Sequence, residues 1–193
     1  MTTTTDLATA SARDIAALVT ARTASPVEVM QATLARIARL NPGINGFQIL
    51  LAEDAMAAAR AAEAAVMRGD PLGPLHGVPA TIKDVQAVAG TPTRKGSPLP
   101  DATPDTQDAP LVARLRAAGA IILGKTTLPD RGWMAYSDSP LSGPTHNPWK
   151  RGYTAGGSSS GAAALCAAGI APLHLGTDGA GSVRLPAHFC GVV

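Results

Sequence analysis

The chain has 193 residues, enough for one domain with a sizeable core, and its 46% hydrophobic and 16% charged residues exclude an intrinsically disordered protein. The net charge of +2 and the 3% aromatic content argue against partners such as nucleic acid or an anionic membrane surface. We find no signal-peptide pattern and no membrane-spanning apolar run, and two lone cysteines suit a reduced compartment. We therefore expect a cytoplasmic protein.

The first seventy residues have the apolar spacing of helices, which we predict over residues 11–22, 25–40 and 51–69. The second of these helices opens with Ser25 as the expected N-cap and Glu28 three residues later, which together form a capping box. We expect it to end at Asn41-Pro42-Gly43, because proline and glycine interrupt helices. This part of the chain is therefore predicted to be helical.

Strand-like and helical segments alternate over the remaining residues, which indicates an α/β sheet. Residues 126–157 interrupt this alternation with a long irregular stretch that contains both tryptophans and both tyrosines, and loops of that length are usually functional. The predicted segments are a strand at 78–85, a helix and a strand over 110–125, a small-residue helix at 158–169 and a strand at 171–178.

Residues 119–126, GAIILGKT, match the pattern G-x-x-x-x-G-K-[ST] of phosphate-binding loops. Such a loop turns backbone N–H groups inward, but the residues between these two glycines are apolar and favour a buried strand. A helical pattern also precedes the match, whereas a phosphate loop follows a strand. We therefore predict a helix stop at Gly119, a buried strand, and Lys125 at the end of that strand, with no nucleotide site.

Three other segments carry residues that suit nucleophilic catalysis. Lys83 ends an apolar strand, where burial lowers the pKa of a lysine and makes it a usable base. Residues 158–160 are serines on a tight turn before a helix, and Ser182 follows Gly-Ala-Gly, where N–H groups can converge on one oxygen. Each has an ordinary alternative, namely a solvated lysine, a flexible turn and an N-cap, so the indication comes from their combination.

Residues 157–161 also match G-x-S-x-G, the nucleophile elbow of α/β-hydrolases. That elbow needs an apolar strand before it, which residues 147–156 do not provide. It also needs an acid and then a histidine later in the chain, for which only Asp178 and His188 qualify, at a short spacing. We therefore disfavour this interpretation.

The serine-rich segment and the sequence GTDGAGSVRLPAHFCGVV, with Ser158 and Ser182 24 positions apart, resemble the amidase signature family. The segments GPLHGVPATIKD, RLRAAGAIILGKT and GPTHNPWKRGYTAGGSSSG carry the same resemblance, which covers about residues 25–193. It implies an α/β fold with helices around a mixed central sheet that is incomplete on its C-terminal side. Residues 1–70 would form an N-terminal helical segment, and residues 71–193 the N-terminal part of one continuous catalytic core.

The resemblance also implies roles for individual residues. Lys83 would be a neutral base, Ser158 a bridging serine held in a cis peptide, and Ser182 the nucleophile that forms an acyl-enzyme. The remaining expected positions are the oxyanion-hole N–H groups of Gly179, Ala180, Gly181 and Ser182, the supporting residues Ser159, Asp178 and Arg184, and a substrate wall of Trp133, Met134 and Tyr136. Asp178 and Arg184 could equally be a structural ion pair, and the wall could equally be a surface loop.

Two positions depart from the common family pattern. Ala180 stands where a glycine is usual, and it can keep an N–H donor in place if its φ is negative. Ser160 also stands in a glycine position, which we expect to be loosely constrained. Because Ser158 and Ser159 are retained, we expect these departures to have little effect.

The resemblance implies an amide hydrolase that releases ammonia or an amine from a small or aryl-type amide, with no cofactor, no metal, and no nucleic-acid or membrane partner. Two alternatives stay open: an amidotransferase component for glutaminyl- or asparaginyl-tRNA formation, and a non-catalytic, incomplete fragment. Family members are more than twice as long, so we expect the chain to expose an apolar edge and to need a missing C-terminal half. Assembly into a homo-oligomer is left open.

Overall fold

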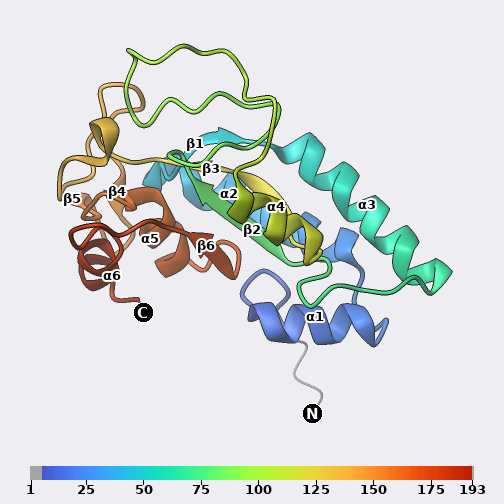
Figure 1. The fold of residues 1–193 in the computed structure, drawn as a ribbon. Helices are drawn as coiled ribbons and strands as arrows, with labels where there is room; N and C mark the ends of the chain where they lie inside the picture. Colours follow the sequence, from blue (N-terminus) through green and yellow to red (C-terminus); the bar gives the residue numbers. More distant parts are fainter. Residues whose placement is uncertain (1–5, 193) are drawn as a thin grey trace.

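A four-stranded sheet in the order β1-β3-β2-β6 forms the centre of the fold, which the computed structural model describes for residues 6–192 (Figure 1). Strand β2 runs parallel to β3 and to β6, whereas β1 is antiparallel to β3. The predicted mixed α/β fold is therefore confirmed. The strands are β1 (Phe47–Leu50), β2 (Pro79–Lys83), β3 (Ile121–Thr126) and β6 (Leu173–Leu175).

Helices pack on both faces of this sheet. On one face α2, α3 and α5 share an apolar core with Ile121 and Leu123, and on the other face α4 packs against Ile82 and Ile122. Helix α1 joins the ends of α2 and α3 in a separate small cluster. The helices are α1 (Ala12–Thr20), α2 (Pro26–Ile44), α3 (Ala52–Arg68), α4 (Pro110–Ala117), α5 (Ser160–Ala167) and α6 (Arg184–Cys190).

The predicted start of α2 is confirmed and its predicted end is wrong. Ser25 Oγ accepts the Val27 N–H, and Glu28 accepts the Ser25 N–H at 2.8 Å, as in a capping box. The helix then continues through Pro42 to Ile44 and is capped by Asn45, whose φ is +57°. The turn beyond the proline is closed by the Asn45 N–H, which donates to the Asn41 carbonyl at 2.7 Å.

The stretch at 126–157 contains more regular structure than we predicted. A 3₁₀ turn forms at η1 (Asp130–Gly132), and β4 (His146–Asn147) pairs with β5 (Lys150–Thr154) in a short antiparallel hairpin. Residues 1–5 of the predicted helical segment and Val193 of the predicted core lie outside the described residues. None of the helices within residues 6–192 is long and apolar enough to cross a membrane.

The phosphate-loop match is part of the sheet, as predicted. Ile121–Thr126 is strand β3, and every one of its residues is buried. The Lys125 side chain is fully buried and lies 2.6 Å from a carboxylate oxygen of Asp84. The backbone N–H groups of this segment are therefore used by the sheet and do not form an open loop.

Candidate active site

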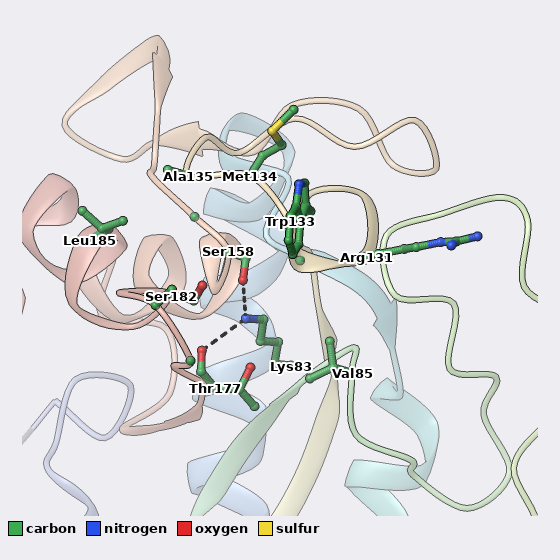
Figure 2. A pocket seen from close by; sticks show the side chains of 14 residues that line it. Lys83, Val85, Arg131, Trp133, Met134, Ala135, Ser158, Thr177, Ser182 and Leu185 are labelled. Atoms are coloured by element: carbon green, nitrogen blue, oxygen red, sulfur yellow. Dashed lines mark hydrogen bonds between the residues drawn. The ribbon is translucent and has the colours of Figure 1, made fainter.

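Lys83 is the last residue of β2, and its side chain reaches the start of α5 (Figure 2). Only 1% of the residue is exposed. Its Nζ lies 2.8 Å from Ser158 Oγ and 3.4 Å from the Thr177 carbonyl oxygen. Burial lowers the pKa of Lys83 to about 8, and the negative charge of Asp178 opposes this effect. A substantial fraction of this amine is thus neutral in mildly alkaline solution.

Ser158 and Ser159 lie in the turn that enters α5, and the peptide bond between Gly157 and Ser158 is cis. The Ser159 hydroxyl donates to the Thr177 carbonyl and accepts the Thr177 N–H, both at 3.3 Å. Ser160, which we expected to be loosely constrained, is fully buried and donates to the Gly156 carbonyl at 2.7 Å. Hydrogen bonds therefore tie the turn before α5 to the segment that follows β6.

Ser182 lies in the turn between β6 and α6, and the Ser159 N–H donates to its carbonyl oxygen at 3.0 Å. Ser182 and Ser158 line the same cavity, and Figure 2 shows the Ser182 side chain beside the Lys83–Ser158 pair. The three predicted catalytic side chains thus come together from β2, the start of α5 and the turn before α6.

Asp178 organises the Ser182 turn. Its carboxylate accepts the N–H groups of Gly181 at 2.6 Å and Val183 at 3.0 Å, and it also pairs with the Arg184 guanidinium at 3.0 Å. The Arg184 hydrogen bond and these N–H groups hold the pKa of Asp178 far below its usual range. The Arg184 side chain is largely exposed, so this ion pair is not buried.

The predicted oxyanion-hole residues divide into two groups. Gly179, Ala180 and Ser182 line the cavity, whereas the Gly181 N–H is directed to Asp178. Gly181 has φ of +105°, a conformation that favours glycine, and Ala180 is not among the residues with positive φ. The departure from the family pattern at Ala180 thus falls where the backbone does not require glycine.

The cavity has a volume of about 650 Å³ and one largely apolar wall. Trp133 and Met134 belong to this wall, Val85 and Leu185 are further apolar residues of the lining, and Figure 2 shows the Arg131 side chain extending away from the serines. Tyr136 is not part of the lining and faces a separate hollow beside β5. The structure therefore brings two of the three predicted wall residues to the site.

Sequence reasoning missed Thr177 and Leu185. Thr177 acts through its backbone carbonyl, which no residue type reveals, although it directly precedes Asp178 in the predicted nucleophile segment. Leu185 reaches the cavity because α6 begins at Arg184, and no helix was predicted there. Within residues 6–192, no three His, Cys, Asp or Glu side chains are grouped to hold a metal ion.

The fold and the site together define an α/β protein in which a buried lysine and two serines meet at one cavity. The sequence model of the Amidase family matches residues 28–193. The chain therefore belongs to the amidase family.

Relatives and solved structures agree with this assignment. The chain is 48% identical to an acylamidase of Rhodococcus erythropolis, over 95% of the chain and 38% of the relative. It is 42% identical to a glutamyl-tRNA(Gln) amidotransferase component of Acidothermus cellulolyticus, over 97% of the chain and 37% of that relative. A bacterial aryl acylamidase of the amidase signature family superposes with a TM-score of 0.88 at 38% identity, over 93% of this chain and 37% of that one. The chain thus spans less than two-fifths of these relatives.

Proposed function

We propose that the chain carries the catalytic groups of an amide hydrolase, with Lys83 as base, Ser158 as proton relay and Ser182 as nucleophile. The observation that carries this proposal is the 2.8 Å contact between Lys83 Nζ and Ser158 Oγ, in a cavity that Ser182 also lines. A buried amine with a lowered pKa can accept a proton near neutral pH, which an ordinary lysine does not do.

In the proposed reaction the Ser182 hydroxyl proton passes to Ser158 while the Ser158 proton passes to neutral Lys83. Ser182 Oγ attacks the amide carbon and forms a tetrahedral intermediate. The same two groups then return a proton to the amide nitrogen, so the C–N bond breaks and ammonia or an amine leaves. Water attacks the resulting ester on Ser182 by the same proton route, which releases the acid and restores the enzyme.

The negative oxygen of the intermediate needs hydrogen-bond donors that are fixed in advance. We propose the N–H groups of Gly179, Ala180 and Ser182 for this role, because these residues line the cavity. The Gly181 N–H instead donates to Asp178, which also pairs with Arg184. We therefore propose that Gly181 does not donate to the negative oxygen and serves the oxyanion hole only by giving the turn its positive-φ conformation. Ser159 supports the site by tying the two turns together.

For the substrate we propose a small or aryl-type amide. The exposed Trp133 ring and Met134 form an apolar wall beside the serines, which suits an aromatic or aliphatic group. An acylamidase and an aryl acylamidase among the similar proteins support the same class. We further propose that residues 71–193 form the N-terminal part of a catalytic core, preceded by a helical segment at 1–70. Both cysteines are free, which accords with a cytoplasmic location.

A second candidate function is that of an amidotransferase component, which the 42% identity to part of such an enzyme favours. That function requires partner proteins, and ammonia would pass to a mischarged tRNA instead of to solvent. Affinity purification of the protein from its own cells, followed by mass spectrometry, separates the two candidates. Recovery of stoichiometric partner proteins would support the amidotransferase.

The central test is intact-mass labelling with a serine-reactive fluorophosphonate on the parent chain and on Ser182→Ala. We expect one adduct on the parent and none on Ser182→Ala, because only an activated serine attacks the phosphorus. Ser160→Ala is a matched control, since it removes a neighbouring hydroxyl outside the proposed relay. Equal labelling of parent and Ser182→Ala would contradict the assignment of the nucleophile.

A further inference from the structure

A fully buried ion pair lies beside the proposed base and has no part in the reaction described above. Lys125 Nζ is 2.6 Å from Asp84 Oδ1, and both side chains are 0% exposed. Burial of two charges is costly unless every polar atom finds a partner. Here Lys125 Nζ also donates to the Pro92 carbonyl at 2.9 Å and to Thr93 Oγ1 at 2.7 Å, so its ammonium group has two hydrogen bonds besides the contact with the carboxylate.

The pair holds the end of the strand that carries Lys83. Asp84 directly follows Lys83, and its N–H donates to the Thr126 carbonyl of β3 at 3.3 Å. Successive side chains of an extended segment point to opposite sides, so Lys83 faces Ser158 while Asp84 faces Lys125. Burial raises the pKa of Asp84, and the hydrogen bond from Lys125 acts in the opposite direction.

An irregularity in β3 directs Lys125 toward Asp84. Along the parallel pair, Ala80 is opposite Ile122 but Thr81 is opposite Gly124, so Leu123 is an extra residue in β3. Such a bulge reverses the alternation of side chains beyond it. Lys125 therefore lies opposite Ile82, on the side of the sheet where Asp84 lies, and not on the side of Leu123.

The same pair also holds a turn that supports the cavity wall. The Lys95 N–H donates to Asp84 Oδ2 at 3.0 Å, and the Lys95 carbonyl accepts the Arg131 N–H at 2.7 Å. The Gly96 carbonyl accepts the Ser139 hydroxyl at 2.8 Å. This turn belongs to the loop at 84–109, drawn in green at the top of Figure 1. Trp133 lies two residues beyond Arg131, so hydrogen bonds connect the pair to the wall.

We propose that Lys125 and Asp84 are positioning residues for the reaction. They fix the end of β2, so that Lys83 lies against Ser158. They also hold the 92–96 turn in place, and this turn supports the cavity wall at 131–134. This inference rests on the proposed function. It also accounts for the lysine of the phosphate-loop match, because a charged side chain at that point of β3 holds together the end of β2, the loop at 84–109 and the cavity wall.

The test compares Lys125→Met with the parent and with Val19→Ala, a core variant in the α1 cluster distant from the site. The urea concentration is chosen separately for each variant, so that the two variants are compared at the same free energy of unfolding. Amide hydrogen exchange of peptides covering 91–97 and 130–135 is then measured. We expect faster exchange in both peptides for Lys125→Met only, because the Lys95 and Arg131 hydrogen bonds depend on the pair.

Saturation kinetics of fluorophosphonate labelling give a second readout, because they separate probe binding from the maximal labelling rate. A general loss of stability would not lower the maximal rate selectively. We expect Lys125→Met to lower the maximal labelling rate by about a hundredfold, because the base is displaced. Thr93→Val removes one acceptor of the buried Lys125 ammonium group, so it should speed the exchange and lower the maximal labelling rate in the same direction but to a smaller extent. This milder variant also serves if Lys125→Met does not fold.

Exchange in Lys125→Met equal to that in Val19→Ala would overturn the proposal, as would labelling at the parental maximal rate. If the parent chain is not labelled at all, the proposed function fails for this chain. The exchange comparison then decides the positioning proposal by itself.

Discussion

The burial of Lys83 gives the proposed reaction its pH dependence. Only the neutral amine can accept a proton, and burial lowers the pKa of this group to about 8. The labelling rate of Ser182 should therefore rise with pH through a midpoint near 8, with about a tenth of the maximal rate at pH 7. The measurement is the second-order labelling rate on both sides of that pH at constant ionic strength. A rate that is flat through this range would contradict Lys83 as the base.

Gly181 and Ala180 are adjacent residues with different backbone requirements. Gly181 has φ of +105°, and an added Cβ would lie 3.2 Å from Leu185 side-chain atoms, so Gly181→Ala must distort the turn. We expect the labelling rate to fall about a hundredfold, as for the loss of an oxyanion-hole donor. Ala180→Gly is the matched control, and its rate should stay within about threefold of the parent. Similar losses in both variants would refute this distinction.

The site residues found from the sequence are those whose chemistry shows in their residue type. Lys83, the serines at 158–160 and Ser182 stood out because each is polar in an apolar or glycine-rich setting, and the family resemblance then singled out Ser158. The sequence could not show that the Gly181 N–H bonds to Asp178, or that Tyr136 lies outside the cavity lining, because both depend on how the turns fold in three dimensions.

At the scale of elements, the first turn of α5 packs unusually close to the sheet. An added Cβ on Gly161 would collide with the Gly46 carbonyl oxygen and lie 2.7 Å from the Thr127 backbone nitrogen. Gly161→Ala should therefore push the helix start, with Ser158, away from β3. We expect a loss of about 1–3 kcal/mol in the free energy of unfolding, measured in urea, and a strong loss of labelling.

Gly43→Ala is the control for this prediction. It also places an alanine in a helix, but an added Cβ there has no atom within 4 Å. Its stability should stay within about 1 kcal/mol of the parent, with a tendency to rise, because alanine favours helices more than glycine does. A Gly161→Ala chain as stable and as reactive as Gly43→Ala would rule out the close-packing argument.

Elements with strong local signals were predictable, and elements defined by distant contacts were not. The capping box of α2 and the apolar runs of β2 and β3 gave clear patterns. Strand β1 has only four residues and pairs antiparallel with a strand far along the chain, and β5 (KRGYT) is mostly exposed. Helix α6 has seven residues and includes Pro186, so no helical period could identify it.

At the scale of the whole molecule, the hairpin β4–β5 and helix α6 present large apolar side chains next to one another. The Trp149 indole N–H donates to the Cys190 carbonyl at 2.7 Å, and Asn147 donates to the Phe189 carbonyl at 2.8 Å, so the hairpin lies on the helix. Trp149 is 73% exposed and Phe189 is 46% exposed. We therefore expect these side chains to belong to one contiguous apolar patch, which would be uncommon on an isolated domain.

This surface should bind an anilinonaphthalene sulfonate dye in native buffer. We expect Phe189→Ser to lower the dye fluorescence by about half, because it interrupts a contiguous patch. Leu99→Ser is the control, since Leu99 is 75% exposed on the separate loop at 84–109. Equal signals from the two variants, or no dye binding by the parent, would contradict a contiguous patch.

The Lys83–Ser158 contact joins residues 75 positions apart in the chain, and Lys83 also contacts Thr177, 94 positions away. Contacts across such long intervals require the closure of large loops, which is slow and comes with the completed fold. The proposed nucleophile can therefore become reactive only after β2, α5 and β6 have assembled. A fluorophosphonate pulse during refolding would then report when the native state forms. Spectroscopic probes of helix content do not, because helices can form before these long-range contacts.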